Sequence, residues 1–523
     1  MVTVNEAINR ISKSLGKAGK TALFTAFFAG LFTHMSALVS DFPNHDGLAS
    51  MYFDQNMITS GRWFLGAACA ITSYFSLPWL IGLISLIYIS IACVATVKIL
   101  KVEDPVYAFL ISLIISVFPS LASNFAYVFT MDGYMFGMLL CVLAVRVTGL
   151  YKKFGWLIGA VLLAFGMGCY QSYICISMVL CLYLVAQILL SDETVKEKAV
   201  SIAKYFGMGA FGVALYYVLL RVLLLIQGKK LDTYQGINEM SETNGVGIVA
   251  TVKEMYVDFV KFTLGKVVVP NVFAFIGLAG LFFIALFLLI RLFAAKKLFK
   301  KPLFYIISLV LIVAVPPVMN AILLISTEVT YHVLMRYQWA FVIVLPIAII
   351  YRLTSLKPFT GKAVTFDFNA FAGWLSLVLV VFVSLSYIVT DNIAYSNLNK
   401  KYEKTYAYCL RIADRIEETE GYYQGIPIAL VGVVGEDSFP LTDITKDVTG
   451  SLLGVWGDHL LYKPENYRDF YKHYLGITFN ILGEDEVVKF YDEDFYAEME
   501  SFPGATSVKL HNGVIYVKTE NIR

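Results

Sequence analysis

Long apolar runs and short polar joints alternate along the first 391 residues of the chain. Most of these runs approach the roughly 20 residues that a helix needs to cross a hydrocarbon core of about 30 Å. Eleven runs stand out, at residues 21–39, 77–97, 105–121, 133–147, 154–170, 172–190, 205–226, 267–290, 303–325, 337–351 and 371–390. The pattern therefore predicts an all-α polytopic membrane protein with about eleven transmembrane helices in residues 1–391.

The composition supports a membrane protein and excludes two other classes. Hydrophobic residues make up 58% of the chain and charged residues 15%, whereas soluble globular proteins carry about 25% charged residues. So few charges cannot cover the surface of a soluble protein of this size. The net charge is only +2, which gives no basis for binding nucleic acid.

Lysine and arginine gather in alternate joints between the predicted spans. The basic joints lie at residues 98–101, 152–153, 196–204, 291–301 and 352–362, whereas the joint at residues 122–132 contains neither lysine nor arginine. Because short cytoplasmic loops carry the excess of positive charge, the basic joints and the N-terminus are expected inside. An odd number of spans then places the C-terminal tail outside.

Residues 392–523 differ in character from the rest of the chain. Residues 397–421 have helical periodicity, while 426–434, 487–491 and 513–519 have the pattern of strands. We expect a small extracytoplasmic α/β soluble domain here. A further apolar stretch at residues 63–74 is short for a span, and its position after the first outer loop favours an interfacial or re-entrant helix.

Charged side chains concentrate in that first outer loop. It contains Asp41, His45, Asp46, Asp54 and Arg62. An ordinary surface loop is one interpretation; the other is a carboxylate that acts as a general base or ion ligand at the lipid–water boundary. A general base must lie within about 3 Å of the hydroxyl that it deprotonates, and Asp46, next to a flexible glycine, is the first candidate. The cluster of Asp41, His45 and Asp46 could also hold a divalent metal, and this alternative stays open.

Other polar side chains lie near the outer ends of predicted spans, and each has a structural alternative. Asp132 begins a span, where it could be a second acid or could complement the helix dipole. Arg221 and Arg336 could bind phosphate, whose oxygens a guanidinium matches, or could anchor the chain at the interface. His332 shares a loop with Arg336. Gln171 places a carboxamide in an otherwise apolar hairpin. The carboxamide could bind a substrate or could stabilise the joint between the two helices.

The candidate residues are acids, arginines, a histidine and an amide at the outer ends of long apolar spans. This combination suits a substrate with a lipid tail and a charged head, such as a polyprenyl-phosphate sugar. The segments His45-Asp46-Gly47, Ser60-Gly61-Arg62-Trp63 and Gly168-Cys169-Tyr170-Gln171-Ser172 resemble the bacterial glucosyltransferases of the type-II Gtr family, which decorate O-antigen. The resemblance covers residues 21–390, and the tail contributes little to it.

The resemblance implies a GT-C type fold in the bacterial cytoplasmic (inner) membrane, with its active site on the outer face. Members take a sugar, here expected to be glucose, from a polyprenyl-phosphate donor. A lipid-sugar synthase and a flippase would supply this donor. The sugar is transferred with inversion to a hydroxyl of a cell-envelope glycan.

Carried over by position, Asp46 becomes the catalytic base, with Asp41 as its rival and Asp132 as a second acid. The pair of adjacent acids expected in this family is replaced here by His45-Asp46. We infer from the residues themselves that the arginines contact the phosphate. The expected substrate and phosphate contacts are His45, Arg62, Gln171, Arg221, His332 and Arg336.

Two other classes of membrane protein are alternatives to a glycosyltransferase. A polytopic glycan polymerase or ligase would concentrate arginines in large outer loops. A lipid-linked saccharide transporter would carry charges near the bilayer midplane and an inverted repeat, which the sequence does not display. In the tail, Trp456, His459 and Tyr462 could stack on an acceptor glycan or form ordinary core and surface. We therefore favour the transferase.

Overall fold

A computed structural model of the chain describes residues 3–41, 43, 45–50, 55–69, 72, 75–232, 245–324, 331–354, 368–431, 461, 463–487 and 494–519. The eleven predicted spans are all helical in it. They form α1 (Val4–Leu38), α4 (Pro78–Ile99), α5 (Pro105–Val117), α7 (Met131–Leu150), α8 (Gly155–Cys169), α9 (Ile174–Leu190), α10 (Val195–Gln227), α12 (Val272–Ala295), α13 (Pro302–Met319), α14 (Gln338–Thr354) and α15 (Phe368–Glu417).

Nine helices in the described residues are long and apolar enough to cross a membrane, and α5 and α8 are apolar but shorter. At 1.5 Å per residue, α5 is about 20 Å long. Its residues are largely buried among the other helices, so that protein rather than lipid surrounds it. The predicted fold class is confirmed: the chain is an all-α multi-pass membrane protein with a small C-terminal α/β region.

The helices begin and end where the local sequence provides caps. Thr194 and Glu197 form a capping box at the start of α10, and Asp104 accepts hydrogen bonds from two backbone amides at the start of α5. Prolines occupy the first position of α4, α5 and α13, where their missing N–H group costs nothing. These signals fix the joints between spans.

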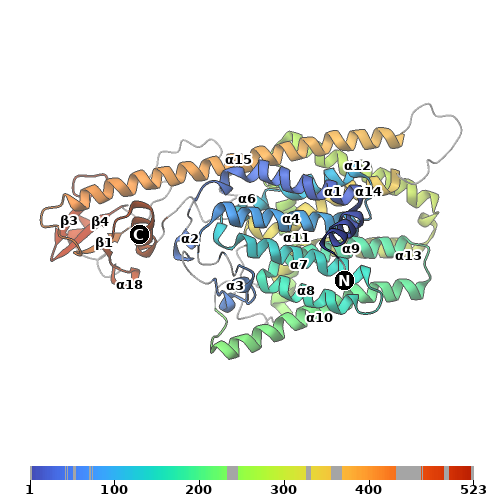
Figure 1. Ribbon diagram of the computed structural model, residues 1–523, viewed down its shortest axis with the longest axis horizontal. Coiled ribbons are helices and arrows are strands. Elements are labelled where there is room, and N and C mark those ends of the chain that lie inside the picture. Colours follow the sequence, from blue (N-terminus) through green and yellow to red (C-terminus); the bar gives the residue numbers. More distant parts are fainter. Residues whose placement is uncertain are drawn as a thin grey trace.

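The helices lie side by side along the long axis of the molecule (Figure 1). α7 and α14 are central, because 83% of the apolar window of each is buried inside the protein, against 11% for α13. α1 packs on α4 and α5, α7 on α4 and α8, and α12 on α14 and α15. α15 runs past the bundle and carries the C-terminal sheet at one end (Figure 1).

Short helical pieces connect the spans. They are α2 (His45–Ser50), η1 (Ile58–Ser60), α3 (Leu65–Ala68), α6 (Ser120–Phe125), η2 (Val128–Thr130), η3 (Gln171–Tyr173), η5 (Leu298–Lys300), η6 (Ala321–Leu324) and η7 (Val333–Arg336). Of the interfacial helix expected at residues 63–74, the described residues contain only the single turn α3. The joint between α10 and α12 contains a further helix, α11 (Gly245–Thr263).

The C-terminal region contains a four-stranded sheet in the order β2-β1-β4-β3, in which only the β3–β4 pair is antiparallel. Its elements are β1 (Pro427–Val431), α17 (Pro464–Phe470), η9 (Tyr471–Leu475), β2 (Asn480–Ile481), α18 (Glu484–Val487), α19 (Asp494–Ala497), β3 (Val508–His511) and β4 (Val514–Lys518). β1 and β4 match two predicted strands. The third prediction is wrong at Val487, which ends α18.

The last turns of α15 are part of the core of this region. Cys409, Ile412 and Ile416 are buried together with strand residues of β1 and β4. The domain boundary expected at 391/392 therefore falls within a continuous helix, and it stays a prediction. Leu48 of α2 belongs to the same core, so that the first outer loop and the C-terminal region are packed against each other.

Candidate active site

Asp46 lies in the first turn of α2, at the end of the bundle that faces the C-terminal sheet (Figure 1). Its side chain is exposed. Leu48, two residues later, is 2% exposed and packs into the C-terminal core, which anchors the short helix. The charge of Asp46 acts on Tyr134 of α7 and on His332. The structure thus brings together residues from three distant parts of the chain around one accessible carboxylate.

Asp41, the rival acid, lies beside the C-terminal region instead. Its Oδ1 accepts a hydrogen bond from Ser76 Oγ at 3.2 Å, and its Oδ2 accepts one from Tyr474 OH at 3.2 Å. Partial burial raises the pKa of Asp41, while these two hydrogen bonds act in the opposite direction. Asp41 therefore links α1 to η9.

The segment Ser60-Gly61-Arg62-Trp63 is held against the joint at residues 168–172. Gln171 Nε2 donates to the Ser60 carbonyl at 2.8 Å, and the Tyr216 hydroxyl donates to the Gly61 carbonyl at 3.0 Å. Gly61 has a φ of +78°, and a Cβ atom there would lie 2.4 Å from Gln171 Nε2. Only glycine fits this turn without strain. Two motifs that the sequence singled out separately are therefore one structural unit.

Arg62 projects from that unit toward α7. Its NH1 donates to the Tyr134 hydroxyl at 3.1 Å, and its Cζ lies 5.0 Å from the ring centroid of Tyr170. The side chain is half-buried. Tyr134 contacts Arg62, and the charge of Asp46 also acts on it. Sequence reasoning missed Tyr134, which is an unremarkable aromatic residue within an apolar run.

Asp132 is only 3% exposed, so a substrate cannot reach its carboxylate directly. Its Oδ1 accepts from the Gly133 amide at 2.9 Å, and its Oδ2 accepts a hydrogen bond from the Thr72 hydroxyl. A carboxylate at the start of α7 also complements the helix dipole. These contacts favour a structural role in fixing the start of α7.

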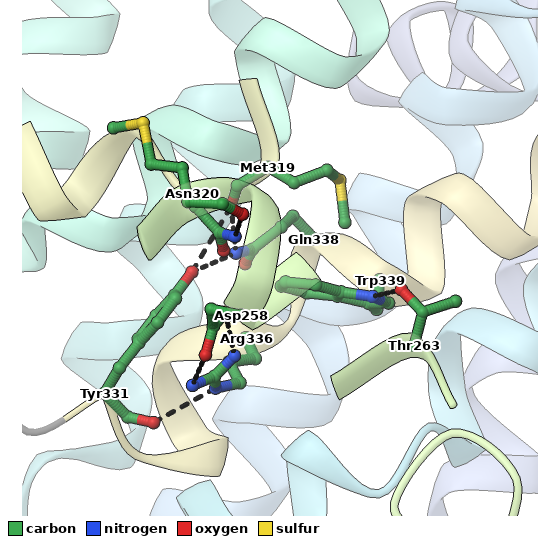
Figure 2. Close-up of polar contacts among 9 residues, drawn as sticks. Asp258, Thr263, Met319, Asn320, Tyr331, Arg336, Gln338 and Trp339 are labelled. Carbon is green, nitrogen blue, oxygen red and sulfur yellow. Dashed lines mark hydrogen bonds and ion pairs between the residues drawn. The ribbon is translucent and has the colours of Figure 1, made fainter. Parts of the chain in front are cut away.

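Arg336 is buried and paired with Asp258 of α11 (Figure 2). NH1 and NH2 donate to the two carboxylate oxygens at 2.6 and 2.7 Å, and Nε donates to the Tyr331 carbonyl at 3.0 Å. The guanidinium also stacks on the Tyr331 ring, with its Cζ 3.7 Å from the centroid. A bidentate pair of this kind is strongly directional. The sequence did not reveal Asp258, because 78 residues separate it from Arg336.

Gln338 and Trp339 make further hydrogen bonds next to this pair (Figure 2). Gln338 Nε2 donates to the Met319 carbonyl and to the Tyr331 hydroxyl, both at 2.7 Å. Trp339 Nε1 donates to Thr263 Oγ1 at 3.1 Å. Together these bonds join α11, α13, η7 and α14 into one rigid cluster, the Arg336 cluster.

His332 directly precedes η7, and the charges of Arg336 and Asp46 both act on it. Burial and the positive charge of Arg336 lower the pKa of His332, and Asp46 raises it by a smaller amount. The imidazole is therefore mainly neutral near pH 7. A neutral imidazole can donate or accept a hydrogen bond, but it offers no charge to a phosphate.

Arg221 lies away from these residues, on the exposed face of α10. Its Nε donates to the hydroxyl of Tyr217, one turn earlier, at 2.9 Å, and its Cζ lies 5.0 Å from the Tyr217 ring centroid. Within the described residues, this geometry matches the alternative of an interfacial anchor.

Several predicted residues lie outside the described residues. They are Asp54, Trp456, His459 and Tyr462, together with the side chain of His45. Among the residues that are described, no three histidine, cysteine, aspartate or glutamate side chains form a group that could hold a metal ion.

The arrangement as a whole offers an accessible carboxylate, a neutral imidazole and a guanidinium at one end of the bundle. A carboxylate can accept a proton from a hydroxyl, and a guanidinium can stabilise charge that develops on a phosphate. Such chemistry fits group transfer at the membrane boundary.

Comparison with protein-family models gives one match, to the glucosyl transferase GtrII family, over residues 35–347. The matched region contains Asp41, Asp46, Arg62, Asp132, Gln171, Arg221, His332 and Arg336, whereas Trp456, His459, Tyr462 and Tyr474 lie beyond it. No curated protein and no solved structure matches the chain significantly. Because the family match covers three-fifths of its length, the chain belongs to the GtrII glucosyl transferase family.

Proposed function

We propose that this chain moves glucose from a polyprenyl-phosphate donor to a hydroxyl of a cell-envelope glycan, with inversion, on the outer face of the bacterial cytoplasmic membrane. The observation that carries the proposal is the position of Asp46. It is exposed at one end of a membrane-embedded bundle, and its charge acts on His332 and on Tyr134, whose hydroxyl accepts a hydrogen bond from Arg62. Family membership favours the transferase over the transporter and polymerase alternatives.

In the proposed reaction, Asp46 accepts the proton of the acceptor hydroxyl while that oxygen attacks the anomeric carbon. The bond from this carbon to the phosphate oxygen breaks, and the polyprenyl phosphate leaves with the electron pair. Arg62 is the cation proposed to stabilise the growing negative charge. A single displacement of this kind inverts the anomeric configuration. Neutral His332 is better suited to a sugar hydroxyl than to the phosphate.

The Arg336 cluster has a positioning role in this scheme. Arg336 already donates to Asp258 and to the Tyr331 carbonyl, and so its donors are largely occupied. By holding the Tyr331 carbonyl, it fixes the backbone that leads directly into His332. We therefore assign phosphate binding to Arg62 rather than to Arg336.

An apolar cavity supports a donor with a lipid tail. The cavity has a volume of about 800 Å³ and is lined by residues of α9, α12, α13 and α14. Along α12 its walls extend from Phe275 to Leu289, which is about 21 Å at 1.5 Å per residue. Thr263 and Trp339 also line it, so the cavity reaches the Arg336 cluster. α12 packs mainly on α14 and α15, whereas α13 packs mainly on α9 and α11. The cavity occupies the space between α12 and α13.

The C-terminal region is proposed to hold α2 in place beside an acceptor glycan. Its core includes Leu48, and its Tyr474 donates to Asp41. Both contacts lie within a few residues of Asp46.

A transfer assay tests the proposal. The purified chain is incubated with polyprenyl-phosphate glucose and an envelope glycan, with nucleotide-linked glucose as the control donor. The expected result is glucose on the glycan with inverted anomeric configuration from the lipid-linked donor only. Transfer from the nucleotide donor, or retention of configuration, would contradict the proposal.

A further inference from the structure

A second, chemically different pocket lies at the opposite end of the bundle from Asp46. It has a volume of about 300 Å³ and is lined by residues of α4, α7, α9, α10 and α14 and of the adjoining joints. Arg352, in the last turn of α14, lines this pocket. The C-terminal sheet lies at the opposite end of the bundle, at the far end of α15 (Figure 1). This basic pocket is separate from the site proposed for sugar transfer.

Five cations and a single carboxylate line the basic pocket. The cations are Lys98, Lys101, Arg146, Lys204 and Arg352, and the carboxylate is Glu193. Within the described part of the chain, none of these five cations forms an ion pair. Lys98, Arg146 and Lys204 are half-buried, where their mutual repulsion is screened less by salt than at an open surface. The pocket therefore has an excess of positive charge that an anion would relieve.

The cations of neighbouring joints are different, because they do have partners in the protein. Lys296 Nζ lies 3.2 Å from Asp192 and also donates to the Leu190 carbonyl at 3.1 Å. Lys198 Nζ donates to the Leu189 carbonyl at 3.0 Å. The absence of ion pairs is thus a property of the pocket rather than of this end of the bundle as a whole.

A half-buried amide in the same pocket gives independent evidence for an acceptor. Gln187 Oε1 accepts from Arg352 NH1 at 2.7 Å, which fixes the orientation of the amide. Gln187 Nε2 is buried and makes no well-aligned hydrogen bond in the described residues, where the Tyr183 hydroxyl lies close to it. A buried donor without a well-placed acceptor is unfavourable, and a ligand oxygen would satisfy it.

We propose that the basic pocket binds the phosphate of an anionic membrane phospholipid. Ile99, Leu184 and Ile188 form apolar walls beside the cations, and they suit the start of an acyl chain. Basic pockets between membrane helices are a known kind of site for anionic headgroups. The lipid is a structural ligand here, since the pocket is remote from Asp46, and the inference does not depend on the proposed transfer reaction.

Lipid retention by the full chain tests this inference. The chain is purified in detergent, mixed with phosphatidylglycerol, with phosphatidylcholine or with inorganic phosphate, and bound lipid is measured by native mass spectrometry. We compare wild type with the double variant Arg146→Gln/Lys204→Gln. Each basic residue near an anionic headgroup contributes about a factor of five in affinity, so the double variant should lose about 30-fold.

Two controls make the test specific. Lys152→Gln/Lys153→Gln also removes two charges at this end, but both lysines are exposed and neither lines the pocket, so the affinity should change by less than about two-fold. Glu193→Gln removes the single carboxylate and should raise the affinity. If Arg146→Gln/Lys204→Gln does not fold, Lys101→Gln/Arg352→Gln, which removes two exposed cations, replaces it.

Preferential retention of phosphatidylglycerol that falls in the pocket variant, and not in Lys152→Gln/Lys153→Gln, supports the inference. Equal retention of the two lipids overturns it, and so does an equal loss in both double variants. Saturation by inorganic phosphate without discrimination between lipids also overturns it, because the site would then take a soluble anion.

Discussion

Two charged regions lie near each other at the sheet end of the bundle, and they are built in opposite ways. In the Arg336 cluster, the guanidinium and Asp258 are largely buried and bonded through both carboxylate oxygens. Asp46 is exposed on a six-residue helix, and Arg62 is half-buried against two tyrosines. Both regions contain the acid and arginine expected of an active site. The difference shows that burial and access, more than residue type, separate a structural pair from residues that a substrate can reach.

The largest effect is expected from breaking the buried pair. Asp258→Ala leaves the Arg336 charge buried without compensation, which costs about 3–5 kcal/mol of stability. Thermal unfolding in detergent should show a large fall in Tm. The double variant Asp258→Ala/Arg336→Met should be less destabilised than the sum of the single variants. A normal Tm with lost activity in Asp258→Ala would instead place the pair in the chemistry.

Arg62 should affect catalysis rather than stability. A hydrogen bond to a charged group contributes about 1.5–3 kcal/mol, so Arg62→Gln should lower kcat/KM about 100-fold, with Tm nearly unchanged. Arg62→Lys should recover only part of the activity, because an ammonium does not stack on Tyr170 as a guanidinium does. Arg221→Gln is the comparison on the exposed face of α10, and it should change kcat/KM by less than about two-fold. Equal losses in both would contradict the placement of Arg62 in the site.

The apolar cavity can be tested with a matched pair of substitutions on α13. Val315 lines the cavity, whereas Val310 does not and is exposed. Val315→Trp should raise the KM for a long polyprenyl-phosphate glucose about ten-fold, which corresponds to about 1.4 kcal/mol, and Val310→Trp should not. A donor with a short lipid tail should be unaffected by either. A similar rise with both donors would mean that Val315→Trp disturbs the protein rather than the tail site.

The smallest effect is expected from pH. The pKa of His332 is lowered, so the neutral imidazole is the form proposed to bind the sugar near pH 7. Acidification protonates it, so kcat/KM should fall as the pH drops below the usual imidazole range. Because the native state resists this proton more than the unfolded chain, stability also decreases as the pH falls through the native pKa. The His332→Gln variant should not show this fall of kcat/KM with acidification. An unchanged fall in the variant would mean that another group titrates.

The sequence predicted the membrane part well because the bilayer constrains it strongly. Every backbone group in lipid must bond internally, so all eleven apolar runs are helices. α11 was missed, since an amphipathic helix in a joint lacks a continuous apolar run. β2 and β3 have only two and four residues, too few to give a clear alternating pattern.

The sequence also indicated part of the candidate site, and the roles of its residues stay predictions. It selected Asp46, Arg62, Gln171 and His332 as members of one outer site. It did not distinguish them from Arg336 or Asp132, whose bonds to Asp258 and Thr72 are made across 78 and 60 residues. Such long-range partners leave no local signal in a single sequence, and they decide which charges are already engaged.

The central claim is that Asp46 acts in the reaction while the Arg336 cluster maintains the structure. The most direct measurement is kcat for transfer from polyprenyl-phosphate glucose by Asp46→Asn, together with its Tm. Asp192→Asn, an exposed acid at the basic end, is the control. The account predicts a fall of about 10²–10⁴ in kcat for Asp46→Asn with an unchanged Tm, and wild-type kcat for Asp192→Asn. Full activity in Asp46→Asn would contradict the account and leave Asp41 as the candidate base.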